Sequence, residues 1–142
     1  MIAMEVMIDT NVVIDALECR SPWNEEAEQI IILAAEKKIN AHISASSVTD
    51  IYYLIRKSRT KAESRKVISD LAKLMNFVSV DHGDCIKAVD SEVDDFEDAL
   101  ISVCAAKAKS KYIITRNVKD FAGSKVNAVT PENFLAKIKN IY

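Results

Sequence analysis

The sequence contains few residues that interrupt regular structure, with only two glycines and two prolines among its 142 residues. It therefore lacks the composition that keeps chains disordered. Its three cysteines, Cys19, Cys85 and Cys104, are odd in number and far apart, and no Cys-x-x-Cys pair occurs. This pattern argues against a disulfide framework and against a structural zinc site. We therefore expect a protein of the reducing cytoplasm.

Long hydrophobic runs and a dominant charge are also missing. The longest mainly apolar runs, residues 30–35 and 99–106, are far shorter than the ~20 residues of a membrane-spanning helix. The first eight residues contain Glu5 and lead into Asp9, which is unlike the basic and then long apolar start of a signal peptide. Nineteen basic and 21 acidic residues give a net charge of −2. No overall positive field attracts nucleic acid or a membrane, so any nucleic-acid contact must use local patches.

The residues that are present predict one domain over residues 1–142, because 49% of them are hydrophobic and the length fits a single core. Short β-rich runs alternate with longer helical ones. This alternation is typical of a layered α/β domain with a mainly parallel sheet. The predicted strands are residues 3–8, 40–44, 76–80, 111–115 and, more weakly, 125–129.

Helices are predicted in the gaps between these strands. An apolar stripe at three- and four-residue steps indicates a helix over residues 23–38. Ser46 or Ser47 can begin a helix that runs through residue 56, and Thr60 can begin one that runs through residue 74. Pro131 suits the first turn of a final helix. We interpret His82 as a loop residue.

Four segments place carboxylates or amides just after a predicted strand or at the start of a predicted helix. Each has an ordinary local explanation, because Asp caps helices, Ser-x-x-Asp has the spacing of a capping box, and turns use Asn and Asp. Their convergence is informative, since the carboxyl ends of parallel strands meet at the edge where open α/β sheets bind ligands. The residues concerned are Asp9, Asp50, Asp98, Asn117 and Asp120.

Asp98 carries a further signal, because it shares a helix face with Ile101 and Ala105, which should pack on the sheet. An inward-facing carboxylate needs a partner. We interpret Asp94, Asp95 and Glu97 as ordinary acidic residues at a helix N-terminus.

Several carboxylates gathered at one edge repel one another unless they share protons or surround a cation. Oxygen ligands suit Mg²⁺ or Mn²⁺. The two histidines, His42 and His82, lie outside the four segments, so a conventional zinc site is not expected. The sequence therefore predicts a hard divalent cation, Mg²⁺ or Mn²⁺, among these side chains.

Taken in order, these segments resemble the PIN domain family of metal-dependent nucleases over almost the whole chain. The resemblance implies a three-layer α/β/α sandwich with a central, mainly parallel sheet of four or five strands. It also implies that Asp9, Asp50 and Asp98 are the principal metal ligands. The segments that carry it are Ile8-Asp9-Thr10-Asn11, the stretch from Ile43 to Tyr53, Asp95-Phe96-Glu97-Asp98-Ala99-Leu100, and the stretch from Ile113 to Phe121.

Two positions depart from the pattern of the family. Many members have Glu where this chain has Asp50, and many have Asp where it has Asn117. Either Asn117 or Asp120 can therefore complete the site, with Asn11 and Thr115 supporting it. Small stand-alone members resemble the VapC toxins of toxin–antitoxin pairs, which implies an antitoxin partner and a homodimer.

The expected function is metal-dependent hydrolysis of RNA by a two-metal mechanism, with Asp9, Asp50, Asp98 and Asp120 as the catalytic acids. The resemblance favours single-stranded or looped RNA. Arg56, Arg116 and Lys119 are candidate substrate residues, although basic residues on helices and turns are usually just solvated.

Two alternatives come from other functional classes. One is a phosphoacceptor or signalling domain, which the position of Asp9 on the first strand disfavours, and the other is a catalytically silent binding module. An Asp-x-Asp phosphatase is disfavoured because Asn11 stands two residues after Asp9.

Overall fold

Five parallel strands form the centre of the computed structural model, which describes residues 3–141. The strand order is β3-β2-β1-β4-β5, so β1 lies in the middle with its register set by Met7 opposite His42 on one side and Ile113 on the other. The strands are β1 (Met4–Ile8), β2 (Ile39–Ser44), β3 (Asn76–Val78), β4 (Tyr112–Ile114) and β5 (Asn127–Val129).

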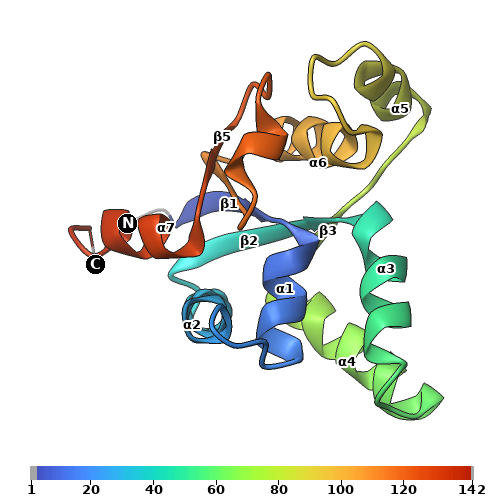
Figure 1. Cartoon of the computed structure of the whole chain (residues 1–142), viewed down its shortest axis with the longest axis vertical. Helices are drawn as coiled ribbons and strands as arrows, with labels where there is room; N and C mark the ends of the chain where they lie inside the picture. Colours follow the sequence, from blue (N-terminus) through green and yellow to red (C-terminus); the bar gives the residue numbers. More distant parts are fainter. Residues whose placement is uncertain (1–2, 142) are drawn as a thin grey trace.

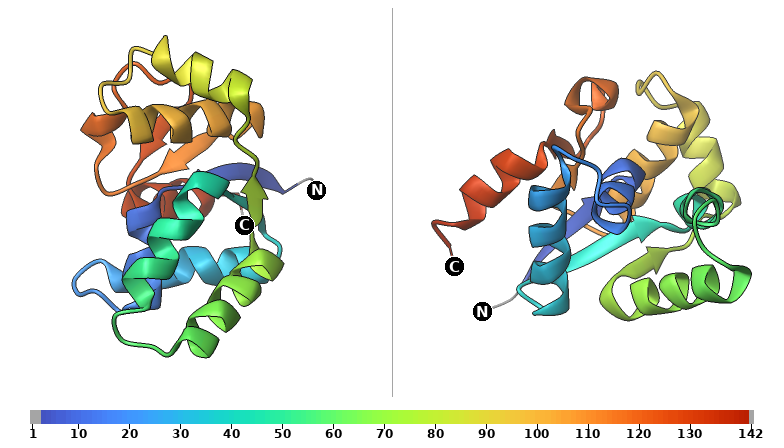
Figure 2. Two further views of the ribbon diagram at one scale, coloured as in Figure 1. Left: turned by 90° about the vertical axis from the view of Figure 1, so that its right-hand side faces the viewer. Right: turned by 60° about the horizontal axis from the view of Figure 1, so that its bottom comes forward.

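Helices cover both faces of this sheet, which gives the three-layer α/β/α sandwich that the family resemblance implied (Figures 1 and 2). One face packs against α1, α2, α3, α4 and α7, and the other packs against α6, with α5 lying outside α6. The helices are α1 (Thr10–Leu17), α2 (Asn24–Ala35), α3 (Ala45–Ile55), α4 (Lys61–Leu74), α5 (His82–Val89), α6 (Phe96–Lys107) and α7 (Pro131–Ile138), with a 3₁₀ turn η1 (Val118–Phe121).

The alternation of side chains along the strands produces these two cores. On β1, Val6 and Ile8 face the larger helical layer, while Met7 faces α6, and all three are 0–1% exposed. Strands buried on both faces carry continuous apolar runs, as is usual for parallel sheets between helical layers.

The helix ends show where local signals hold. Helix α4 begins after Thr60 as predicted, where Thr60 and Glu63 form a capping box, and α7 begins at Pro131 as predicted. Ser44, rather than Ser46 or Ser47, caps α3, because β2 passes directly into this helix without a loop.

One helix was missed by the sequence analysis. The loop assignment of His82 is wrong, since His82 is the first residue of α5, which Asp81 and Asp84 begin with a capping box. The helix has only eight residues and contains Gly83 near its start, so its periodic signal is short.

The topology determines where polar residues can meet. The segments that follow β1, β2 and β4 all leave the same edge of the parallel sheet and lead into α1, α3 and η1. Over residues 3–141, no helix has both the length and the apolar character needed to cross a membrane.

Candidate active site

A cavity of about 640 Å³ opens at the carboxyl edge of the sheet. We call it the acidic pocket, because it brings together acids and amides from β1–α1, α3, the start of α6 and the η1 region. These are Asp9, Asn11, Asp50, Glu97, Asp98, Asn117 and Asp120. Residues up to 111 positions apart in sequence therefore share one cavity, as the parallel sheet requires.

Asp9 is the most deeply placed acid of this pocket, with 7% of its surface exposed. The Thr115 hydroxyl donates to Asp9 Oδ2 at 2.7 Å, and the Thr10 amide donates to Oδ1 at 2.8 Å. The Asn117 amide in turn donates to the Thr115 hydroxyl at 3.0 Å. This chain of hydrogen bonds fixes the carboxylate of Asp9 and links it to the segment that follows β4.

Burial raises the pKa of Asp9 above its ordinary value, and the charge of Asp120 raises it further. The hydrogen bonds from Thr115 and Thr10 act in the opposite direction, since they stabilise the ionised form. A neighbouring cation would favour the same ionised form.

The acids at the start of α6 repel their neighbours strongly. A hydrogen bond with Asp50, burial and the charges of Asp50, Asp95 and Asp98 raise the pKa of Glu97 to about 7. Burial and the charges of Asp9, Asp95 and Asp120 raise the pKa of Asp98 to about 6. Near neutral pH, the Glu97 carboxyl is therefore partly protonated, and its proton can be donated to Asp50.

Glu97 is the residue that the sequence analysis missed. It was interpreted as an ordinary acid at a helix N-terminus, but it lines the acidic pocket and contacts Asp50 on α3. The only sequence signal was its position next to Asp98, which places both residues in the first turn of the same helix. Its partner on α3 is 47 positions away and leaves no local pattern.

The donor set of the acidic pocket fits a hard cation. All the acids and amides are oxygen donors, their carboxylates raise one another's pKa values, and the buried Asn11 Oδ1 has no hydrogen-bond partner. Such a set suits Mg²⁺ or Mn²⁺. Within residues 3–141, no group of three or more His, Cys, Asp or Glu side chains is arranged so that it could hold a metal ion.

A family model described as the PIN domain matches residues 5–119. The chain belongs to the PIN domain family. No curated protein sequence is significantly similar to it.

Solved structures share the fold of this PIN domain at low sequence identity. VapBC2 from Rickettsia felis is 17% identical, with a TM-score of 0.65 and coverage of 89% of this chain and 98% of that one. VapBC from Salmonella typhimurium is 16% identical, with a TM-score of 0.66 and coverage of 90% and 98%. PAE2754 from Pyrobaculum aerophilum is 15% identical, with a TM-score of 0.58 and coverage of 97% and 98%.

The basic residues of this PIN domain that were predicted to contact substrate are not gathered in the acidic pocket. Arg116 Nε and Nη2 donate to the two carboxylate oxygens of Asp15 at 2.6 and 3.3 Å, and its guanidinium lies 4.0 Å from the centre of the Trp23 ring. Lys119 lines an adjoining cavity beside Asp120, and Arg56 lines a groove between α3 and α4. Arg116 is thus engaged within the fold, and a substrate contact by any of the three stays a prediction.

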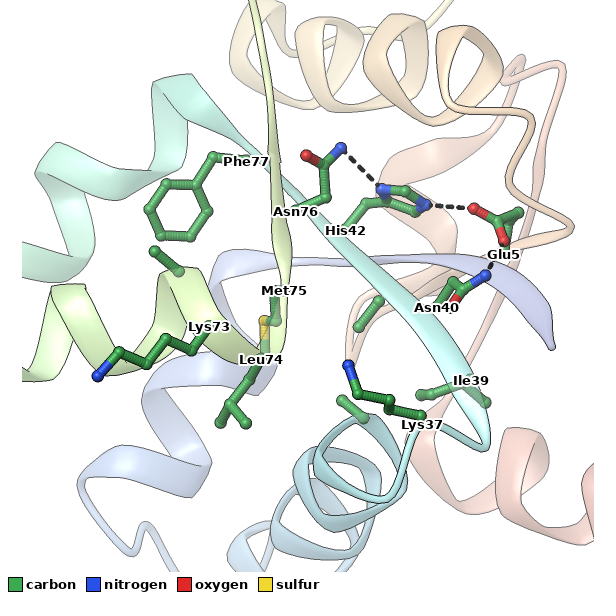
Figure 3. Close-up of a pocket in the computed structure, with 13 residues that line it drawn as sticks. Glu5, Lys37, Ile39, Asn40, His42, Lys73, Leu74, Met75, Asn76 and Phe77 are labelled. Carbon is green, nitrogen blue, oxygen red and sulfur yellow. Dashed lines mark hydrogen bonds and ion pairs between the residues drawn. The ribbon is translucent and has the colours of Figure 1, made fainter.

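Another polar cluster of the PIN domain lies in a separate cavity of about 570 Å³ (Figure 3). His42 is 8% exposed, with its Nε2 2.8 Å from Glu5 and its Nδ1 3.1 Å from Asn76. Both ring nitrogens are therefore occupied by neighbours on β1 and β3, and neither is free to bind a cation. The placement agrees with the expectation that this histidine is not part of the acidic site.

Proposed function

We propose that this PIN domain is a metal-dependent endoribonuclease that hydrolyses phosphodiester bonds. The observation that carries the proposal is the gathering of four aspartates and two asparagines from four segments into one pocket at the carboxyl edge of the sheet. Asp9, Asp50 and Asp98 would hold Mg²⁺ or Mn²⁺, and Asn117 or Asp120 would complete the site. When bound, the cation would lower the pKa of a coordinated water and stabilise negative charge on the phosphate.

The protein's own side chains orient this site. Thr115 holds one oxygen of Asp9 and is itself held by the Asn117 amide, so the carboxylate is positioned before any ligand arrives. Asn11 supports the pocket with a buried oxygen that has no partner. Arg20 and Lys57 also line the pocket and place positive charge where the phosphate backbone of an RNA would enter.

Our inferences about the substrate and partners rest on the family rather than on the geometry. We infer that the substrate is single-stranded or looped RNA, and that cleavage leaves a 5′-phosphate and a 3′-hydroxyl. The VapBC2 structure from Rickettsia felis is described as bound to a DNA fragment from its promoter. By analogy with such pairs, this chain would be the toxin of a toxin–antitoxin pair in the cytoplasm and would form a homodimer.

Cleavage of labelled RNA by the purified protein tests the proposal. We expect cleavage with Mn²⁺, none with EDTA, and loss of at least two orders of magnitude in rate in Asp9→Asn, in line with the typical contribution of a positioned catalytic group. Asp90→Asn is the matched control, because Asp90 is exposed and does not line the acidic pocket. Circular dichroism checks that both variants fold.

The same assay separates the alternatives. Cleavage that survives EDTA or persists in Asp9→Asn refutes the metal-dependent nuclease. Labelling of an aspartate by acetyl phosphate without any cleavage would instead indicate a signalling domain. The absence of both cleavage and labelling would indicate a binding module that keeps only the fold.

A further inference from the structure

The groove between α3 and α4 that Arg56 lines has a volume of about 590 Å³ and lies next to the acidic pocket. We call it the tyrosine groove. Tyr53 lines both cavities, so the two adjoin at this side chain. The residues of the groove that matter here are Tyr52, Tyr53, Arg56, Lys61 and Arg65.

One aromatic side chain of the tyrosine groove is unusually exposed. Tyr53 is 67% exposed, although it belongs to a helix whose other face is fully buried at Ile51 and Ile55. Its ring meets that of Tyr52 edge-on, with 5.2 Å between the centroids and an interplanar angle of 88°. The edge contact from Tyr52 supports the ring of Tyr53 and leaves much of its surface open. An exposed ring does little for the core but offers a stacking surface to a flat ligand.

The charge of the groove contrasts with that of the whole molecule. Residues 56–66 contain six basic residues and one acidic residue in a chain of net charge −2. Arg59 pairs with Glu18 and Lys66 with Asp70, both outside the groove. In the part of the chain that the structure describes, no carboxylate forms an ion pair with Arg56, Lys61 or Arg65.

We propose that the tyrosine groove binds the nucleotides that flank the scissile phosphate of a single-stranded RNA. A base stacks on Tyr53, and the adjoining phosphates contact Arg56, Lys61 and Arg65. This inference rests on the proposed function, because the acidic pocket has to hold the scissile phosphate that these nucleotides flank. The combination of an open aromatic ring with unpaired cations matches a backbone that alternates flat bases and negative charges.

The groove selects single strands for a geometric reason. A base can cover the Tyr53 ring only when it is not stacked within a duplex, which is how aromatic surfaces recognise single-stranded RNA. The unpaired cations then hold phosphates without reading sequence. The groove therefore sets strandedness and orientation, while the acidic pocket holds the phosphate to be cleaved.

Binding can be measured without cleavage by fluorescence anisotropy with a short labelled RNA, Mg²⁺ and protein carrying Asp9→Asn. On that background, Tyr53→Ala should weaken binding by about 5- to 150-fold, the range for loss of one stacked base. Tyr53→Phe is the matched control, because it keeps the ring, and should bind within about twofold of the parent. A duplex of the same sequence should bind more weakly and should not respond to Tyr53→Ala.

The phosphate contacts are tested by the salt dependence of binding. Arg65→Gln should lower the slope of log affinity against log salt by about 0.7, the value for one phosphate contact to a single strand. Lys66→Gln is the matched control, because the neighbouring Lys66 pairs with Asp70 and does not line the groove. Its slope should equal that of the parent.

The outcomes distinguish this inference from the proposed function. If the native protein cleaves RNA but Tyr53→Ala and Arg65→Gln bind like the parent, the groove proposal is overturned and the ribonuclease stands. In that case the groove would bind a protein partner instead. A stable complex that forms with the native protein but not with the same variants would identify it. If groove variants lose RNA binding while the native protein never cleaves RNA, the ribonuclease is overturned and only RNA binding by the groove is supported.

Discussion

The ion pair between Arg116 and Asp15 gives the strongest stability prediction, because Asp15 is the most buried carboxylate of residues 3–141. Its side chain is 1% exposed, whereas that of Arg116 is 22% exposed. Arg116→Met removes both hydrogen bonds to Asp15 and leaves an uncompensated charge inside the fold. Breaking a buried pair in this way costs about 3–5 kcal/mol of unfolding free energy. For a domain of this size, the melting temperature should fall by about 10 °C.

Removing the other partner should cost less, which is the informative asymmetry. Asp15→Asn leaves the Arg116 guanidinium partly exposed and still over the Trp23 ring at 4.0 Å, where water and the aromatic face can solvate it. We expect a loss of about 1–3 kcal/mol, the range for hydrogen bonds to a charged group. The double variant should lose less unfolding free energy than the sum of the two single variants. Once Asp15 is replaced by Asn, removing Arg116 no longer leaves a buried charge without a partner.

Guanidinium chloride unfolding, followed by circular dichroism, measures all three variants. Lys119→Met is the matched control, since Lys119 is exposed on the same connection and forms no ion pair in residues 3–141; its change should stay within about 0.5 kcal/mol. The reasoning fails if Arg116→Met costs under 1 kcal/mol, which is less than about one net hydrogen bond, or if the losses simply add.

Three further changes test other parts of the structure by denaturant unfolding. Without metal, Asp98→Asn should be more stabilising at pH 8 than at pH 5, by about 1 kcal/mol after allowing for solvent screening. The pKa of Asp98 is raised from 3.8 to about 6 in the fold. Its ionisation therefore lowers stability as the pH rises through the interval between these two values, and the full cost remains at higher pH. A benefit that does not grow with pH would contradict this. Ser64→Ala should stabilise by about 1 kcal/mol, since the fully buried Ser64 hydroxyl has no partner and Ala favours helices; destabilisation would reveal a missed hydrogen bond. Gly123→Ala should destabilise by about 1–2 kcal/mol, because Gly123 has φ +91° and a new Cβ would lie 3.0 Å from that of Glu92; unchanged stability would show that the loop relaxes freely.

The sequence predicted the gathering of Asp9, Asp50, Asp98, Asn117 and Asp120 because that gathering follows from topology. In a parallel sheet, residues just beyond the strands are brought to one edge regardless of their distance in sequence. The structure places these side chains around the acidic pocket. Their roles as ligands and catalytic groups stay predictions, since shared position does not by itself establish chemistry.

What the sequence could not provide was pairing between distant side chains. Arg116 was grouped with possible substrate residues, but it meets Asp15 across 101 positions, and no local pattern marks such a pair. The proximity of Glu97 to Asp50 was hidden for the same reason. Helix α3 begins before the predicted start at Ser46 or Ser47, because Ser44 both ends the strand and caps the helix.

The direct passage from β2 into α3 also limits how the acidic pocket can change shape. With no connecting loop between Ser44 and Ala45, α3 cannot shift far without disturbing a strand hydrogen-bonded to both neighbours. The opposite side, formed by Asn117 and Asp120, belongs to a short 3₁₀ turn and its approach. A cation bound in the acidic pocket would therefore be accommodated by adjustment of the side formed by Asn117 and Asp120, while Asp50 keeps its position relative to the sheet.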